Sequence, residues 1–116
     1  MTLAEIYLKA AEVIRTNGHY KGAYFGLTEG CVGIELSAAE RPVCVAGALS
    51  VVICGHPQPW EDDDFDKAAA DFASRILTSF DEGNPVSSLA DWNDSDRRTA
   101  ADVIAALEQA AKAVAA

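Results

Sequence analysis

The chain has 116 residues, half of them hydrophobic, and its 18 acidic residues outnumber nine basic ones to give a formal net charge of −9. This length and apolar content suit one folded domain, residues 1–116, and exclude a disordered chain. An acidic chain repels phosphate backbones and anionic lipid surfaces, so we expect no nucleic acid and no membrane among its partners.

The N-terminal residues lack the basic and apolar regions of a signal peptide. The longest apolar run, residues 43–54, is shorter than the roughly 20 residues that a membrane span needs. The three cysteines are an odd number without framework-like spacing, which favours free thiols in a reducing compartment. We therefore expect a cytoplasmic protein, in the host cytoplasm if a phage encodes it.

The clearest predicted helix covers residues 3–15. Its apolar residues recur at steps of three and four and form one stripe: Leu3, Ile6, Ala10, Val13 and Ile14. Thr2 and Glu5 have the spacing of a capping box, and Asn17-Gly18 favours the end of the helix. This segment is predicted to be amphipathic, with one face in the core.

A glycine-rich excursion follows, over residues 19–39. Its four-residue glycine spacing is not a phosphate-binding loop, because no Gly-Lys-Ser/Thr follows it. The pattern favours an irregular segment with one small β-hairpin that turns near Glu29-Gly30.

A second helix is predicted over the apolar run of residues 43–54. Pro42 suits the first turn of a helix, and Gly55 suits its end. The β-branched residues of the run argue for a strand, but its length and small residues favour a closely packed central helix. The two prolines of residues 56–60 then predict a connector.

Two further helices are predicted in the second half of the chain. The third begins at the acidic residues 61–64 and ends near Gly83, and its buried stripe is Phe65, Ala68, Ala69, Phe72, Ile76 and Phe80. Residues 86–91 are predicted to be a short turn. The last helix is expected to be capped by Asn93, Asp94 or Ser95. The fold class is thus mainly α, a compact bundle of about four helices with one small hairpin between the first two.

A signature lies near the C-terminal end: Trp92-Asn93-Asp94, a short spacer, Arg98-Thr99 and an amphipathic helix. It resembles the C-terminal signature of an uncharacterised family of short proteins from actinobacteria and their phages. Cys44-x-x-Gly-Ala-Leu also resembles the core motif of that family, whereas His19 stands where the family would have tryptophan. The resemblance implies a compact, mostly helical fold and a bacterial or phage setting, and it implies no mechanism.

A structural role explains this signature: Trp92 anchors a turn, Asn93 or Asp94 caps a helix, and an arginine pairs with a carboxylate such as Asp91 or Asp94. The structural motif is therefore predicted to comprise Trp92, Asn93, Asp94, Arg98 and Thr99. The alternative is a small-anion site, because a helix N-terminus beside two arginines attracts negative charge. The aspartates among these residues weaken that alternative.

Five residues could supply metal or thiol chemistry: His19, Cys31, Cys44, Cys54 and His56. None of them forms the paired Cys-x-x-Cys or His-x-x-x-His clusters that are typical of zinc sites. Thiol catalysis needs a cysteine beside a histidine, and the spacing does not establish such a pair. We therefore expect no metal, no cofactor and no catalytic residues, which favours a non-enzymatic protein.

The acidic run beside Trp60 is the strongest candidate for a functional surface. The simpler explanation of this run is that it keeps the protein soluble and places favourable charge at the start of a helix. The functional hypothesis is a partner-binding surface made of Trp60, Glu61, Asp62, Asp63, Asp64 and Asp66. The leading prediction is a bacterial or phage accessory protein that acts by protein–protein interaction through this face.

Two alternatives stay open. One is a small ligand-binding domain or enzyme, with a pocket between the glycine-rich excursion and the central helix that would use His19, Tyr20, Lys21 and Cys44. The other is a homo-oligomer that associates through the alanine-rich last helix, whose small residues permit close helix approach.

Overall fold

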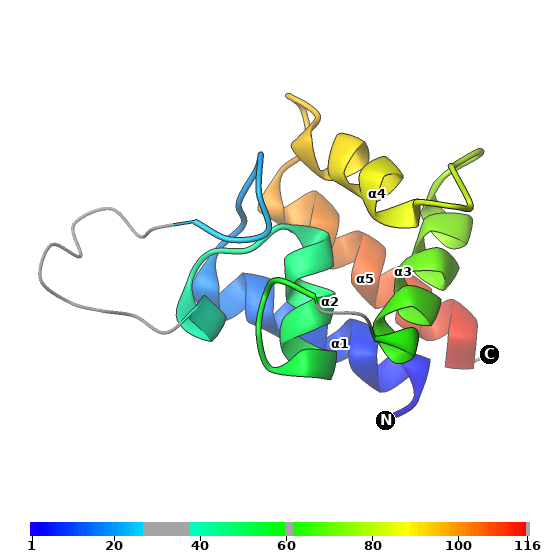
Figure 1. Cartoon of the computed structure of the whole chain (residues 1–116), viewed down its shortest axis with the longest axis horizontal. Helices are drawn as coiled ribbons and strands as arrows, with labels where there is room; N and C mark the ends of the chain where they lie inside the picture. The colour runs from blue at the N-terminus through cyan, green and yellow to red at the C-terminus, as the bar shows by residue number, and fades with distance from the viewer. Residues whose placement is uncertain (27–37, 60–61, 116) are drawn as a thin grey trace, which may run out of the picture.

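The computed structural model describes residues 1–26, 38–59 and 62–115. These residues form five α-helices and one short 3₁₀ helix: α1 (Leu3–Asn17), η1 (Ala38–Glu40), α2 (Val45–Cys54), α3 (Asp63–Ile76), α4 (Pro85–Asp94) and α5 (Ala100–Ala115). The mainly helical class that the sequence predicts is confirmed. Figure 1 shows that α1 begins and α5 ends at the same end of the molecule.

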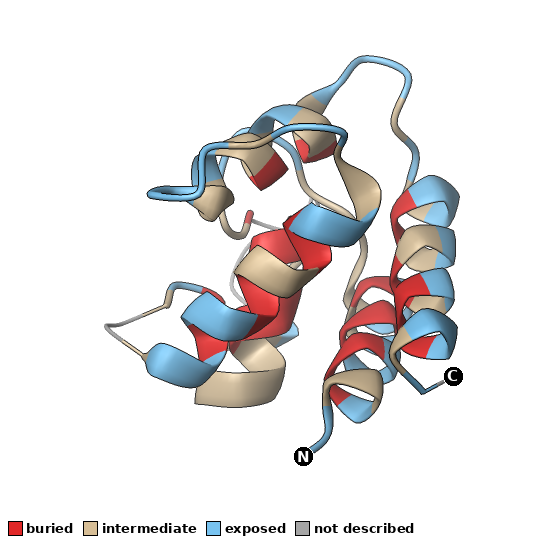
Figure 2. Cartoon of the chain, turned by 90° about the vertical axis from the view of Figure 1, so that its right-hand side faces the viewer, coloured by how far each residue is buried: buried red, intermediate tan, exposed pale blue. Residues whose placement is uncertain are grey.

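Helix α1 packs most extensively against α5, and it also packs against α2. The capping box that the sequence predicts at Thr2 and Glu5 is present at its start. The buried residues of α1 and α5 lie on the inward faces of the two helices (Figure 2). Apolar stripes with helical spacing therefore bring the two ends of the chain together.

Helix α2 is the most deeply buried element. Its first six residues, 45–50, are all buried, as expected for a central helix with small residues. Ser50, the only polar side chain in this run, donates a hydrogen bond of 2.5 Å to the carbonyl oxygen of His56. That bond satisfies the buried hydroxyl and joins the middle of α2 to the proline-containing connector that follows the helix.

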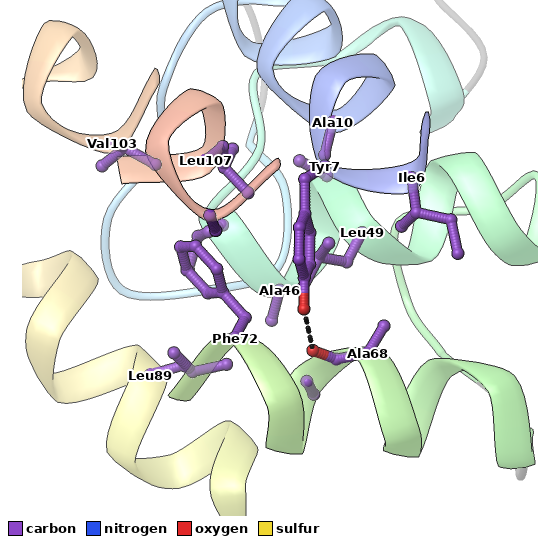
Figure 3. Close-up of a cluster of buried hydrophobic side chains, with 14 of the residues drawn as sticks. Ile6, Tyr7, Ala10, Ala46, Leu49, Ala68, Phe72, Leu89, Val103 and Leu107 are labelled. Carbon is purple, nitrogen blue, oxygen red and sulfur yellow. Dashed lines mark hydrogen bonds between the residues drawn. The ribbon is translucent and has the colours of Figure 1, made fainter. Parts of the chain in front are cut away.

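Tyr7 joins α1 to α3 in the middle of the core and is fully buried. Its hydroxyl donates to the carboxylate of Asp71. The same hydroxyl lies 3.3 Å from the carbonyl oxygen of Ala68, a contact drawn as a dashed line in Figure 3. Burial, reinforced by Asp71, raises the pKa of Tyr7. Partial burial would raise the pKa of Asp71, but hydrogen bonds from Arg75 and Tyr7 outweigh it and hold that pKa below its ordinary value.

We expect Tyr7→Phe to lower the free energy of unfolding at neutral pH by about 2 kcal/mol, the usual loss for a hydrogen bond to a charged group. Because the folded-state pKa of Asp71 is lowered, its contribution is complete above its unfolded-state pKa of about 4 and is lost as the pH falls further. The difference between variant and wild type should therefore narrow as the pH falls below about 4. Urea unfolding at a series of pH values measures this.

The matched control for this prediction is Tyr20→Phe, because the Tyr20 hydroxyl has no hydrogen-bond partner among the described residues. We expect that variant to follow the pH dependence of the wild type. A Tyr7→Phe difference that stays constant through acid would contradict the coupling between Tyr7 and Asp71.

The structure corrects three helix boundaries. Helix α2 begins at Val45 and not at residue 43, and Pro42 lies before the helix rather than in its first turn. Cys44 is the N-cap, because its Sγ accepts a hydrogen bond of 3.2 Å from the amide of Gly47. Helix α3 ends at Ile76 and not near Gly83. Phe80 still packs against the core, but from the connecting segment.

The third correction concerns residues 86–91, which are helical and not a turn. They belong to α4, which begins with Asn84 as N-cap and Pro85 in its first turn. This extra helix raises the number of described α-helices above the predicted four. The hairpin predicted near Glu29-Gly30 lies outside the described residues. The described residues contain only isolated bridges, from Val43 to His19 and to Phe25.

Candidate functional site

Asn93, the last residue but one of α4, is fully buried and makes more hydrogen bonds than the other buried polar side chain of the described residues, Ser50. Its Oδ1 accepts a hydrogen bond of 2.9 Å from the amide of Val45, the first residue of α2. The same oxygen lies 2.7 Å from the Nε2 of His19. Its Nδ2 donates to the carbonyl oxygen of Tyr20 at 3.0 Å and to Asp94 Oδ1 at 2.9 Å. Asn93 therefore joins α4, the start of α2 and the segment after α1.

These contacts fix the tautomer of His19. The Nδ2 of Asn93 faces two acceptors, a carbonyl and a carboxylate, so the oxygen of the amide must face Val45 and His19. The Nε2 of His19 must then carry its proton and donate to that oxygen. The imidazole is therefore held by a buried amide.

The segment after α1 has further attachments to the end of α4. The amide of Gly22 donates to Asp94 Oδ1 at 3.0 Å, and Lys21 Nζ donates to the carbonyl oxygen of Ser95 at 2.6 Å. Tyr20 N donates to the carbonyl oxygen of Val43 at 2.8 Å. Residues 19–22 are thus attached on one side to the chain before α2 and on the other to the end of α4.

Trp92 and Arg98 complete the contacts of the signature. The Trp92 ring meets Phe72 edge to face, and the Arg98 guanidinium lies over the Trp92 ring, 4.3 Å from the ring centroid. Arg98 Nε also donates to the carbonyl oxygen of Trp92 at 3.0 Å. The predicted pairing of an arginine with Asp91 or Asp94 is therefore wrong for Arg98, which contacts the tryptophan instead.

The predicted cap of the last helix is also corrected. Asn93 and Asp94 end α4, whereas Thr99 begins α5: its Oγ1 accepts from the amide of Asp102 at 3.1 Å. In return, the Asp102 carboxylate accepts from the amide of Thr99 at 3.0 Å. This reciprocal pair is a capping box with aspartate in place of glutamate.

A cleft of about 560 Å³ opens where the first turns of α2, α3 and α4 meet. Its lining is mostly apolar and includes the side chains of Tyr24, Phe65, Val86 and Ala90. The complete set of described residues that line it is Gly22, Ala23, Tyr24, Cys44, Ala46, Pro59, Phe65, Asp66, Asn84, Val86, Ser87, Ala90 and Asp94. None of these residues is basic.

Gly47 sets the position of the wall that Tyr24 forms. A Cβ atom at Gly47 would lie 2.2 Å from the carbonyl oxygen of Tyr24, which is itself bonded to the amide of Cys44 at 3.1 Å. Only glycine lets the backbone of Tyr24 approach the first turn of α2 this closely. The glycine of the Cys-x-x-Gly-Ala-Leu motif thus has a steric role beside the cleft.

Cys44 lines the cleft, but its thiol is poorly suited to nucleophilic attack. Burial raises its pKa, and this effect outweighs the amide of Gly47 that donates to the sulfur. A thiol with a raised pKa is protonated at neutral pH, whereas the thiolate is the reactive form. Burial also raises the pKa of the neighbouring Tyr24 hydroxyl.

The acidic surface predicted from the sequence adjoins this cleft. Asp66 lines both the cleft and a second hollow, of about 740 Å³, formed by Asp62, Asp63, Asp64 and Asp66. Asp62 is the N-cap of α3 and accepts from the amide of Phe65 at 3.0 Å. The other three are exposed, and none of them has an ion-pair partner among the described residues. Trp60 and Glu61, predicted as part of the same surface, lie outside the described residues.

The predicted ligand-pocket residues are divided between two environments. Cys44 lines the cleft, while His19, Tyr20 and Lys21 are bonded to Asn93, Val43 and Ser95 and do not line it. Most of the lining is new relative to the sequence prediction. The Asn84-Pro85 start of α4 is the sequence feature from which its α4 wall could have been found.

The histidine, cysteine, aspartate and glutamate side chains of the described residues form no group of three or more that could hold a metal ion. No helix in the same ranges has both the length and the apolar character to cross a membrane.

Comparison with known proteins places the chain in a family. No curated protein and no solved structure matches it. The model of a family of unknown function, DUF6197, matches residues 1–113 and so covers nearly the whole chain, including Asn93 and the residues that line the cleft. The chain therefore belongs to DUF6197, which is the kind of uncharacterised family that its C-terminal signature predicts.

Proposed function

We propose that this protein is a non-enzymatic accessory protein of bacterial or phage origin, and that it binds a segment of a partner protein in the cleft between α2, α3 and α4. One observation carries the proposal: an open, mostly apolar cleft adjoins an exposed acidic turn at Asp66. Apolar surface that stays open at a junction of elements is typical of binding sites.

The chemistry of the interior residues supports binding rather than catalysis. Burial keeps the Cys44 thiol protonated, and the Nε2 of His19 is held by Asn93. His19 and the Cys44 thiol are therefore not arranged as a general base and its nucleophile. The signature residues Trp92, Asn93 and Thr99 make contacts within the fold, so they support the walls of the cleft rather than line it.

The packing of α5 also favours binding in the cleft over self-association. The small residues Ala110 and Ala111 of α5 are buried, and α5 packs most extensively on α1. These small residues of α5 therefore allow close packing against α1 of the same chain, and not against a second copy.

The proposal can be tested by selecting random peptides, displayed on phage, on the immobilised wild-type protein. We expect enriched peptides that bind Ser87→Trp and Ala90→Trp at least about tenfold more weakly, because a large ring at either position fills the cleft. The matched control is Ala101→Trp, at an exposed position on α5 away from the cleft. Thermal melting would show that each variant is folded. Equal binding by wild type and both filled variants would refute the proposal.

A second candidate is binding of a small organic molecule in the same cleft. The volume of about 560 Å³ favours it, because small-molecule sites usually enclose a few hundred to about 1,000 Å³. A thermal-shift screen distinguishes the two candidates. A compound that stabilises the wild type and not Ser87→Trp, in the absence of any selected peptide, would favour the small molecule.

A further inference from the structure

We infer that the cleft binds one apolar side chain of an extended partner segment, and that the acidic turn of α3 binds lysine or arginine residues next to it. This inference rests on the proposed function and names the chemistry of the partner. Its starting point is the position of Asp66, which lines the apolar cleft on one side and the acidic hollow on the other. A single short segment can therefore reach both.

The charges of the two hollows select for a cationic segment. Asp66 and Asp94 line the cleft, Asp63 and Asp64 continue the surface, and none of the described lining residues is basic. Asp94 uses Oδ1 for Gly22 and Asn93, which leaves its Oδ2 without a hydrogen-bond partner among the described residues. Carboxylates without a cation partner attract lysine and arginine and repel acidic segments.

The helix starts around the cleft do not reverse this preference. A helix N-terminus attracts anions through its free amides, but each of these three is capped. Cys44 Sγ accepts from Gly47 N, Asp62 Oδ1 from Phe65 N, and Asn84 Oδ1 from Ser87 N. The full charges of the aspartates then exceed the partial charge, about half an elementary charge, at each helix start.

The apolar part of the cleft selects for an aliphatic or aromatic anchor. The Phe65 and Ala46 side chains at its base are buried, whereas Tyr24, Val86 and Ala90 around it are half-buried. Binding of an apolar side chain is favourable here, because it removes the remaining exposed apolar surface of these walls from water. An apolar residue flanked by basic residues therefore complements both the apolar cleft and the aspartates beside it.

Fluorescence anisotropy with labelled synthetic peptides tests this inference on the whole chain. The first peptide carries a leucine with lysines on both sides, so that either direction of binding is sampled. Matched peptides replace the leucine with glycine or the lysines with glutamate. We expect the first peptide to bind best, with a loss of about tenfold or more for the glycine peptide. We expect no measurable binding of the glutamate peptide, and weaker binding of the lysine peptide at high salt.

Protein variants assign the binding to these residues. Asp66→Asn should lower the affinity for the lysine peptide by about two- to fivefold, the range for an exposed ion pair. Adding Asp63→Asn and Asp64→Asn should lower that affinity further. The control is Asp91→Asn, an exposed aspartate of α4 that lines neither hollow, which should bind like the wild type. Ser87→Trp tests the apolar half of the site.

The outcomes separate this inference from the proposed function. Glutamate peptides that bind as well as lysine peptides, or full binding by the triple asparagine variant, would overturn the inference. If display-selected peptides still lose binding to the filled cleft in that case, the proposed function stands and only the partner chemistry is wrong. If the filled variants bind selected and lysine peptides equally well, both fail.

Discussion

Asn93→Ala is expected to lower the free energy of unfolding by about 4 kcal/mol. The side chain is fully buried, and its removal leaves the amide of Val45 and the carbonyl oxygen of Tyr20 without their partner. Each buried polar group left in this state costs about 1–3 kcal/mol. Urea unfolding followed by circular dichroism measures the loss.

Asn93→Asp provides a sharper form of the same test. It keeps the shape of the side chain and its acceptor, but it places a carboxylate oxygen where Nδ2 faces Asp94 Oδ1 at 2.9 Å. We expect a loss comparable to that of Asn93→Ala, because an acceptor then faces two acceptors. The control is Asn84→Ala, which removes an exposed N-cap and should cost about 1 kcal/mol. Losses below that control for both Asn93 variants would contradict the role given to Asn93.

Gly47→Ala is expected to have the next largest effect, a loss of about 3 kcal/mol. The added methyl group would lie 2.2 Å from the carbonyl oxygen of Tyr24, so the backbone of Tyr24 must move away from α2. That movement breaks the hydrogen bond to Cys44 and displaces one wall of the cleft. Unfolding measurements and amide chemical shifts of Tyr24 and Cys44 follow the two effects separately.

The control for Gly47 is Gly83→Ala, because the nearest atom to its Cβ is 3.3 Å away on the side chain of Asp81. We expect that variant to unfold within about 0.5 kcal/mol of the wild type, as is usual for surface substitutions. If Gly47→Ala were equally neutral, the close approach of Tyr24 to α2 would be wrong.

Local features of the fold could be predicted where all the partners lie within one turn. The capping box at Thr2 and Glu5 is an example, since its two side chains are three residues apart. The apolar period of α5 is another, because spacing alone determines which face is buried. The same reasoning failed at Phe80. Its four-residue step from Ile76 continues the helical period, yet the chain leaves the helix at Leu77, which is extended.

The start of α4 is a local feature that the prediction of a turn over residues 86–91 missed. Asn84 is the N-cap of this helix, and Pro85 occupies its first turn. Because of this error, one helix fewer was predicted than the described residues form. The Trp-Asn-Asp motif was also assigned to the start of the last helix, whereas it lies at the end of α4.

The candidate site could not be predicted, because its residues come from distant parts of the sequence. Asn93 contacts residues 48, 73 and 74 positions away, and no periodicity specifies which amide will face it. The walls of the cleft likewise come from the starts of three separate helices and from residues 22–24. The sequence did predict the acidic turn, because Asp62, Asp63, Asp64 and Asp66 lie close together in the chain.

The central claim is that a partner protein binds at the cleft, and site-specific photocrosslinking in cells of the source organism tests it most directly. A photoreactive p-benzoylphenylalanine would replace Lys67, which is exposed beside Asp66 and does not line the cleft, and in a second strain Ala101, which is exposed on α5. We predict a discrete crosslinked protein from position 67, lost when Ser87 is changed to tryptophan so that the cleft is filled, and none from position 101. The same adducts from both positions, or none from position 67, would contradict the claim.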